Sequence, residues 1–325
     1  MTNEVRSILV FRAGALGDLL LAGPALLRLR NAFPDVCITL VARTAYSELF
    51  LHTLQPLELL ELGSSRFSPL FLEDALLPEE LSTFIRSFDL VVSWLGPSHE
   101  PFAKNLLRAG ARRLLATPAF PDENSPALPG STPHAADHLL VSLAPLGLAA
   151  AREPLELRLP PYNAQTCDHL LTDCGVNVTD AILAVHPGSG GLSKCWPVEH
   201  FVHVADSLAR VRKMQVLWLV GPAELEHPER FCTGLPGSFV VMASVPILML
   251  AGVIQRARIY LGNDSGVTHL AAAVGTPTLA LFGPTSPDVW APRADRVAVL
   301  HKPRLARLKE ETVLQRLLEM TSELN

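Results

Sequence analysis

The segment over residues 259–287, IYLGNDSGVTHLAAAVGTPTLALFGPTSP, constrains the fold more than any other stretch of the chain. Its apolar start predicts a buried strand that stops at Gly262-Asn263-Asp264, before a helix that opens at Ser265-Gly266. A Gly-Thr-Pro break ends that helix, and residues 278–282 predict a second strand. Strand, polar turn, helix and strand form the unit that presents free backbone N–H groups to an anion. We therefore expect a parallel α/β sheet with a phosphate site at this turn.

The residues of this turn suit an anion. Asp264 or Ser265 can cap the helix, and Gly266 lets a ligand approach the backbone closely. His269 lies four residues after Ser265, so both side chains share one face of the first turns. In the alternative interpretation, the turn only connects a strand to a helix, and His269 is a surface or core histidine.

Length and composition suit two such sheets. A chain of 325 residues is long enough for two α/β domains. Aromatic residues make up 6% of the chain and charged residues 18%, which suits Leu- and Ala-rich helices that cover buried parallel strands. The formal net charge of −5 gives no global basic field, so we expect no nucleic-acid partner.

The five cysteines are odd in number and form no CxxC pair, which indicates a reduced, cytoplasmic compartment and cysteines that act as small core residues. No signal sequence opens the chain, and no uncharged apolar run reaches the roughly 18 residues that a spanning helix needs. Any contact with a membrane is therefore expected to be peripheral.

The chain begins with a β-α-β pattern: residues 7–11 and 36–41 predict strands, and residues 18–31 predict a helix between them. The loop after the first strand lacks GxGxxG, and no acidic residue ends the second strand, which argues against a dinucleotide site. Asp18 lies at the carboxyl end of the first strand. Two interpretations are open: a helix N-cap, or a general base that accepts a proton from a substrate hydroxyl.

Residues 89–94 (DLVVSW) predict a further strand, and a run of cations follows it. Lys104, Arg108 and Arg112 fall at i, i+4 and i+8, which places a basic stripe on one helix face. The stripe is either a solvated face or a surface for a phosphate-bearing acceptor or a lipid headgroup. Residues 149–163, rich in Pro and Leu, are expected to link the two domains.

In the second half, residues 181–185 predict a strand, and the loop HPGSGGLSKCWP leads from it to a helix over residues 198–210. The glycines of the loop let the backbone wrap an anion, and Lys194 supplies a point charge, although the Walker A pattern is absent. Trp196 is expected to pack at the helix start.

Further strands are expected over residues 216–220, near 239–242 and over 258–261, and a closing helix over about 305–323. The first of these strands ends at GPAE. Glu224 again has two open interpretations: it accepts hydrogen bonds from a ribose diol, or it is an acidic residue that starts a helix.

Four segments together resemble glycosyltransferase family 9, the ADP-heptose:lipopolysaccharide heptosyltransferase family: ILVFRAGALGDLLLAGPALLRLRNAFPD, VHPGSGGLSKCWP, GPAE and GNDSGVTHLAAAVGTPTLALFGPTSP. The resemblance implies a GT-B architecture, in which two Rossmann-like domains with parallel sheets face each other across a cleft. Residues 1–160 would bind the acceptor and residues 161–325 the nucleotide sugar. The closing helix is expected to pack back on the first domain.

The resemblance also implies roles for single residues. Asp18 matches the general base that acts on the acceptor hydroxyl. Six positions match the donor-binding residues of the family: Lys194 for the phosphates, Glu224 for the ribose, Asp264 for the sugar, and Ser265, Gly266 and His269 for the diphosphate. Lys104, Arg108 and Arg112 are candidates for acceptor binding, although Ala116 stands where a Gly is common.

The implied reaction is the inverting transfer of a heptose, or a related sugar, from an ADP-sugar to a lipopolysaccharide core or a similar anionic glycolipid. Lys194, His269 and the helix N-terminus can stabilise the departing diphosphate, so no metal or cofactor is expected. We expect a cytoplasmic protein with peripheral contact at the inner face of the cytoplasmic membrane. A nucleotide-sugar epimerase of similar architecture and a non-catalytic nucleotide-sugar-binding protein are the alternatives.

Overall fold

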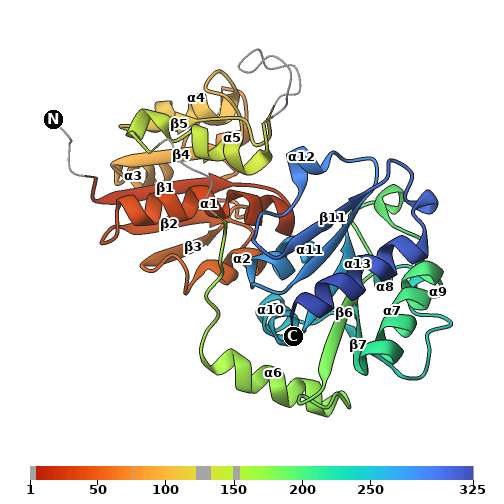
Figure 1. Cartoon of the computed structure of the whole chain (residues 1–325). Coiled ribbons are helices and arrows are strands. Elements are labelled where there is room, and N and C mark those ends of the chain that lie inside the picture. Colours follow the sequence, from red (N-terminus) through yellow and green to blue (C-terminus); the bar gives the residue numbers. More distant parts are fainter. Residues whose placement is uncertain (1–4, 75, 122–132, 149–153, 325) are drawn as a thin grey trace. The chain divides into compact units, whose positions relative to one another are not determined.

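The computed structural model describes residues 5–74, 76–121, 133–148 and 154–324. The chain forms two compact units, Met1–Leu155 and Glu156–Asn325, and each contains its own parallel sheet (Figure 1). The α/β class with two Rossmann-like domains is therefore confirmed. The boundary after Leu155 falls inside the expected linker over residues 149–163, of which 149–153 lie outside the described residues.

The first unit alternates strands and helices along the chain. In order they are β1 (Ser7–Arg12), α1 (Leu16–Ala32), β2 (Cys37–Ala42), α2 (Thr44–Ser47), β3 (Leu57–Glu61), α3 (Glu79–Arg86), β4 (Leu90–Trp94), α4 (Pro101–Arg108), β5 (Leu114–Ala116) and α5 (Ala135–Val141). Short 3₁₀ turns cover Glu48–Phe50, Ser68–Phe71 and Ala144–Leu146. The sheet order is β3-β2-β1-β4-β5, with every pair parallel, which is the order of a Rossmann half.

Strand β1 is the centre of this first sheet and is buried on both faces, as expected for a run of apolar residues between helices. Leu9 and Phe11 point to the face covered by α3 and α4, where Phe11 meets Phe102 edge-to-face at 5.2 Å between ring centroids. Helices α1 and α5 pack on each other. The central strand therefore delivers its carboxyl end, and the residues that follow it, at a fixed point of the sheet.

Helix α1 begins at Leu16, two residues earlier than predicted, and continues without interruption through Pro24. Proline in a helix interior removes one backbone hydrogen bond. Every residue from Leu19 to Leu26 is buried, so the packing of the helix outweighs the lost bond.

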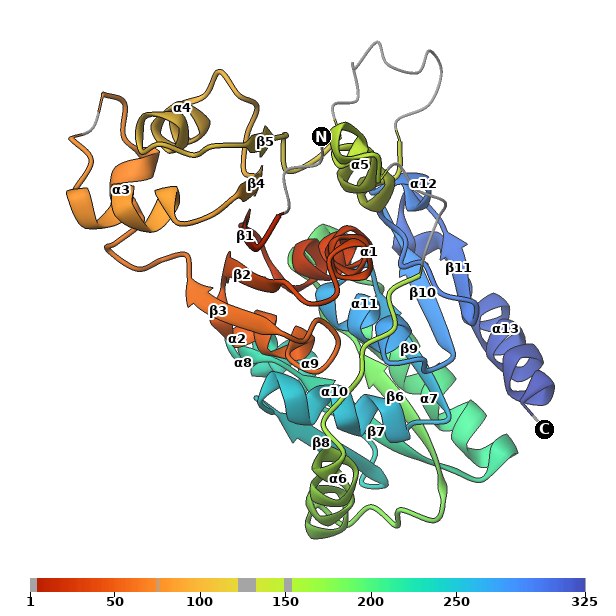
Figure 2. The same ribbon diagram turned by 90° about the vertical axis from the view of Figure 1, so that its left-hand side faces the viewer.

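The second unit continues the alternation. Its elements are α6 (Tyr162–Asp173), β6 (Ala181–His186), α7 (Val198–Arg212), β7 (Met214–Val220), α8 (Pro222–Leu225), α9 (Pro228–Phe231), β8 (Phe239–Ala243), α10 (Ile247–Arg256), β9 (Ile259–Asn263), α11 (Gly266–Ala273), β10 (Thr278–Phe282), α12 (Pro287–Trp290), β11 (Val297–His301) and α13 (Glu310–Glu323). The 3₁₀ turns cover Leu192–Lys194 and Leu305–Arg307. The sheet order is β11-β10-β9-β6-β7-β8, all parallel (Figure 2).

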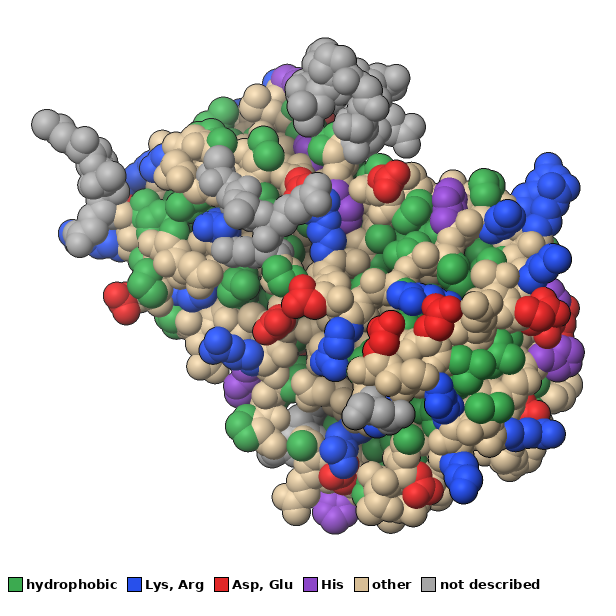
Figure 3. All heavy atoms as spheres, in the orientation of Figure 1, with side chains coloured by type: hydrophobic (Ala, Val, Ile, Leu, Met, Phe, Trp, Pro, Cys, Tyr) green, Lys and Arg blue, Asp and Glu red, His purple; other side chains and the backbone are tan. Residues whose placement is uncertain are grey.

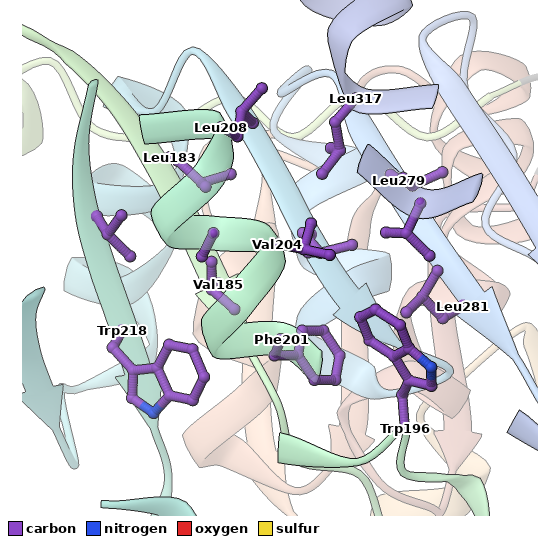
Figure 4. Packing of buried hydrophobic residues seen from close by; sticks show 14 of the residues in the cluster. Leu183, Val185, Trp196, Phe201, Val204, Leu208, Trp218, Leu279, Leu281 and Leu317 are labelled. Atoms are coloured by element: carbon purple, nitrogen blue, oxygen red, sulfur yellow. The ribbon is translucent and has the colours of Figure 1, made fainter. Parts of the chain in front are cut away.

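The core of the second unit lies between its sheet and the pair α7 and α13. Figure 4 shows Phe201, Val204 and Leu208 of α7 packed over side chains from the strands. Trp196 is fully buried at the start of α7 and lies edge-to-face with Phe201 at 5.1 Å. Its indole Nε1 donates to Leu308 O at 3.1 Å, so Trp196 is a packing residue, as predicted.

The closing helix α13 contributes Val313, Leu317 and Met320 to this same core. Its apolar stripe is therefore buried within the second unit, against α7. The contact with the first domain that the family resemblance implies stays a prediction.

Two of the cysteines depart from the sequence expectation. Cys167 and Cys195 are buried, but Cys37 and Cys174 are exposed, because they lie at the first residue of β2 and at the end of α6.

Charged side chains of both signs are scattered among hydrophobic ones over the face shown in Figure 3. Among the described residues, none of the helices has the length and hydropathy that a bilayer crossing requires.

Candidate functional site

The turn that the sequence singles out lies where the order of the second sheet reverses. Strands β6 and β9 are neighbours there, and the loops after their carboxyl ends lie side by side. In open α/β sheets ligands bind at this topological switch point. The loop after β6 is HPGSGGLSKCW and the loop after β9 is Asp264-Ser265, so the two predicted phosphate-binding segments meet.

Asn263 fastens the first of these loops at both ends. Its Nδ2 donates to Pro187 O at 2.7 Å, and its Oδ1 accepts from Trp196 N at 3.0 Å. The side chain is fully buried, so neither bond competes with water. Both ends of the loop between Pro187 and Trp196 are therefore anchored to the last residue of β9. The sequence pattern by itself does not indicate this role of Asn263.

Asp264 is the point on which the neighbouring loops converge. Its carboxylate Oδ2 accepts from Lys194 Nζ at 2.9 Å and from Thr285 Oγ1 at 2.7 Å. Its main-chain oxygen accepts from Ser189 Oγ at 2.6 Å. The Asp264 side chain is 8% exposed, whereas that of Lys194 is 35% exposed. A nearly buried carboxylate is thus paired with a cation whose other donors can reach solvent or a ligand.

Ser265 is the N-cap of α11, as predicted, and its Oγ accepts from Thr268 N at 3.4 Å. The N–H groups of Gly266 and Val267 have no acceptor among the described residues, as expected for the first turn of a helix. His269 is buried on the same helix. Two free N–H groups, the positive end of the helix dipole and the Lys194 ammonium therefore lie around one turn.

The position of Glu224 is compatible with both interpretations from the sequence, a residue at a helix start and a ribose contact. It is buried in α8, and its Oε2 accepts from Gly221 N at 2.7 Å, so it does stabilise a helix start. Its Oε1 lies against Gly188 of the loop after β6, where an ideal Cβ would stand only 1.8 Å from that oxygen. Any side chain at residue 188 would displace the carboxylate. A contact with a ribose stays a prediction.

His186 ends β6 close to Glu224 and is buried. Its Nδ1 lies 3.0 Å from Leu219 O, so this nitrogen carries the proton that the carbonyl accepts. Burial lowers the pKa of His186, against the opposing charge of Glu224 and the bond to Leu219. The neutral imidazole is the favoured form in this position.

In the first unit, Asp18 is the third residue of α1 and not its N-cap, because the helix begins at Leu16. Its Oδ2 nevertheless accepts from Ala15 N at 2.8 Å, so it caps the helix from inside the first turn. The side chain is half-buried, and Oδ1 has no partner among the described residues. The capping function is thus present, and the function as a base stays a prediction.

Arg12 at the end of β1 holds the segment around Asp18 in place. Its Nε and Nη2 donate to Asp18 O at 3.2 and 3.0 Å, and Nη1 donates to Ala119 O at 2.9 Å. The side chain is buried, which lowers its pKa to about 10, while the nearby Asp18 acts in the opposite direction. Arg12 was not among the residues predicted to form the site. The signal was available, since a charged residue ends an otherwise apolar central strand.

The basic stripe is only partly as predicted. Lys104 and Arg108 are exposed on α4, and Arg108 Nη1 donates to Asn105 Oδ1 at 2.9 Å. The helix ends at Arg108, because Gly110 adopts a φ of 96° that breaks it. Arg112 therefore lies beyond the helix, 3.6 Å from Asp89 Oδ1, and the three cations do not share one helix face. Their role in acceptor binding stays a prediction.

The second unit thus presents a set of groups suited to a nucleoside diphosphate sugar. Lys194 and the α11 N-terminus can neutralise a diphosphate, and Asp264 can accept a hydrogen bond from a sugar hydroxyl. Glu224 follows β7, which is separated from β9 by β6 in the sheet. Among the described residues, no group of three His, Cys, Asp or Glu side chains is placed to hold a metal ion.

Comparisons with known proteins identify the family of the chain. Residues 132–318, more than half of the chain, match the sequence pattern of glycosyltransferase family 9 (heptosyltransferase). Lipopolysaccharide heptosyltransferase 3 of Escherichia coli is 29% identical over 154 residues, which are 46% of this chain and 44% of that relative, so the match spans less than half of the relative's length.

Solved structures are similar over nearly the whole chain. The glycosyltransferase family 9 structure from Veillonella parvula DSM 2008 has a TM-score of 0.81 at 22% identity and covers 99% of each chain. The E. coli ADP-heptose lps heptosyltransferase II structure has a TM-score of 0.73 at 16% identity and covers 98% of this chain and 99% of that one. These structures show the shared GT-B fold. With its fold and its family pattern in agreement, this chain belongs to glycosyltransferase family 9, the heptosyltransferase family.

Proposed function

We propose that the protein transfers a heptose, or a related sugar, from an ADP-sugar to a lipopolysaccharide core or a similar glycan acceptor. The transfer inverts the anomeric carbon and needs no metal ion. One observation carries the proposal: Lys194 and the free N–H groups of Gly266 and Val267 surround the same turn as the nearly buried carboxylate of Asp264. A cationic rim for phosphates beside a carboxylate for sugar hydroxyls is the arrangement that a nucleotide-sugar donor requires.

In the proposed reaction, an acceptor hydroxyl oxygen forms a bond to the anomeric carbon while the bond from that carbon to the diphosphate oxygen breaks. Asp18 accepts the hydroxyl proton, and ADP leaves with the electron pair of the broken bond. Lys194, His269 and the N-terminus of α11 stabilise the negative charge that develops on the diphosphate. Attack opposite to the leaving group gives inversion.

The second unit binds the donor in this proposal: Asp264 holds the sugar, Glu224 the ribose, and Ser265 and Gly266 belong to the diphosphate turn. The first unit binds the acceptor, with Asp18 as the base and Lys104, Arg108 and Arg112 as candidate contacts to its anionic groups. We further propose that the protein works in the cytoplasm, with peripheral contact at the inner face of the cytoplasmic membrane where a glycolipid acceptor lies.

The test is release of ADP from ADP-heptose in the presence of a truncated lipopolysaccharide core, with the product's anomeric configuration determined by NMR. We expect ADP and glycosylated acceptor in equal amounts, inverted configuration, and a rate that a chelator does not lower. Absence of transfer with intact donor binding would favour the non-catalytic alternative. Conversion of the donor sugar without any acceptor would favour the epimerase.

A further inference from the structure

Thr285 and Lys194 donate to the same oxygen of Asp264. The distances to Oδ2 are 2.7 Å from Thr285 Oγ1 and 2.9 Å from Lys194 Nζ. The two donors differ in what else they can do. A threonine hydroxyl has one proton to donate, whereas the lysine ammonium has three and is 35% exposed.

Lys194 is therefore a partner that a diphosphate can share. An ammonium drawn to phosphate oxygens interacts less strongly with the carboxylate beside it, since both anions compete for one point charge. Asp264 cannot turn to water instead, because its side chain is 8% exposed. A nearly buried carboxylate that loses a donor changes its orientation or becomes much less favourable as an anion.

The loop that carries Thr285 makes contacts that do not involve the Lys194 ammonium. It lies in the loop between β10 and α12, and the ring of His301 in β11 meets the start of that loop, with Nε2 at 3.1 Å from Gly283 O. Gly283 also lies against Leu305 and the main chain of Ser193, because an ideal Cβ there would be 3.2 Å from Leu305 Cδ1 and 3.6 Å from Ser193 O. The hydroxyl thus reaches Asp264 from a loop with its own anchors.

We propose that Thr285 is a positioning residue for the donor sugar: it holds the Asp264 carboxylate in place while Lys194 serves the diphosphate. This inference rests on the proposed function, in which Asp264 accepts from the sugar and Lys194 donates to the phosphates. It predicts that Thr285 affects the sugar half of the donor and leaves the nucleotide half nearly unchanged.

The experiment measures binding of ADP and of ADP-heptose to the full-length protein by calorimetry, for the wild type, Thr285→Val and Thr285→Ser. Valine keeps the shape and removes the donor, so we expect the Kd for ADP-heptose to rise about 10- to 100-fold, as for a lost hydrogen bond to a charged group. The Kd for ADP should change less than threefold or so. Serine restores the hydroxyl, and with it the affinity for ADP-heptose.

Two further variants separate positioning from mere stability. In an Asp264→Ala background, Thr285→Val should have little additional effect on ADP-heptose binding, because the carboxylate that Thr285 positions is gone. Thr276→Val is the matched control: its buried hydroxyl donates to Ile254 O at 2.8 Å at the far end of β10. We expect this control to lower the melting temperature and to leave both Kd values unchanged.

Three results would overturn the inference. One is an unchanged Kd for ADP-heptose in Thr285→Val, and another is an equal loss of ADP and ADP-heptose binding together with lowered stability. In both cases the wild type would still transfer the sugar, so the proposed function would stand. The third result, a wild type that binds neither ligand and transfers nothing, would remove the proposed function and the inference with it.

Discussion

The two carboxylate oxygens of Asp18 are placed differently. Oδ2 holds the start of α1 through Ala15 N, while Oδ1 has no partner among the described residues. Arg12 fixes the main chain at the same residue from the opposite side. One side chain can therefore cap its helix with one oxygen and accept a proton with the other, so the two interpretations of this residue do not compete.

The substitution Asp18→Asn separates the capping role of this residue from its role as a base. The amide oxygen still accepts from Ala15 N, so the helix start and the folded state should persist, but the amide cannot act as a base at neutral pH. We expect kcat for sugar transfer to fall by ~10²–10⁴, with donor affinity little changed, measured by ADP release and calorimetry. Asp35→Asn, an exposed carboxylate beyond the other end of α1, is the control. Wild-type turnover in Asp18→Asn would remove this residue from the mechanism.

Lys194→Met tests the phosphate contact. Methionine keeps much of the aliphatic chain and removes the charge, so we expect the Kd for ADP to rise about 10- to 100-fold. The same change leaves Asp264 with fewer donors, so some loss of stability should accompany it. Lys309→Met, at an exposed lysine before α13, provides the comparison. Equal ADP affinity in the two variants would contradict the assignment.

At the scale of elements, the loop after β6 is shaped by contacts on both of its sides. Asn263 pins its ends, Ser189 ties its middle to Asp264 O, and Gly188 leaves room for Glu224. A side chain at residue 188 would occupy the space that the Glu224 carboxylate now fills. The loop therefore sets where Glu224 can stand.

Gly188→Ala should accordingly displace Glu224 and weaken ADP binding about tenfold or more, since one charge-assisted contact to the ribose would be lost. The neighbouring Gly190 gives a matched control, because nothing lies within 4 Å of its ideal Cβ. Titration of both alanine variants with ADP distinguishes them. Similar affinities in Gly188→Ala and Gly190→Ala would show that Glu224 does not hold the nucleotide.

Central strands were easier to predict from the sequence than edge strands. β1, β4, β6, β9 and β10 are buried on both faces and read as continuous apolar runs, and their predicted bounds agree with the structure within about two residues. β3 and β11 lie at sheet edges, are only partly buried and were not predicted, whereas the edge strand β8 was expected near residues 239–242.

The same limit applies to the site. Residues on the motifs were found, but the pairs that join them were not, since Asp264 meets Lys194 across 70 residues and Asn263 meets Pro187 across 76. No local pattern encodes such contacts. Thr285 could have been suspected, because it follows a buried strand at the same carboxyl edge as Asp264.

At the scale of the whole molecule, buried ionisable groups link stability to pH. The pKa of His186 is lowered mainly by burial, so the unfolded chain binds the proton more readily than the folded one. Its neutral form contributes fully above the unfolded value of about 6.5, and that contribution is lost as the pH falls below it. The loss adds up to about 1.4 kcal/mol per pH unit for one proton.

His186→Gln should flatten this dependence, because the amide can still donate to Leu219 O and does not titrate. Urea unfolding at pH 7, 6 and 5 measures it, with tryptophan fluorescence from Trp196 and Trp218 reporting on the second unit. His169→Gln, at an exposed position of α6 in the same unit, should keep the wild-type slope. An identical acid-side slope in all three proteins would exclude His186 as the source.

The side-chain amide of Asn263 forms hydrogen bonds with both ends of the loop between Pro187 and Trp196. The distance between the two ends of this loop is therefore set by Asn263, and not by the residues of the loop itself. An inserted residue would bulge outward, and a deleted one would pull an anchor loose. To make the protein accept a bulkier sugar nucleotide, exchanging side chains within this loop is therefore a better strategy than lengthening the loop.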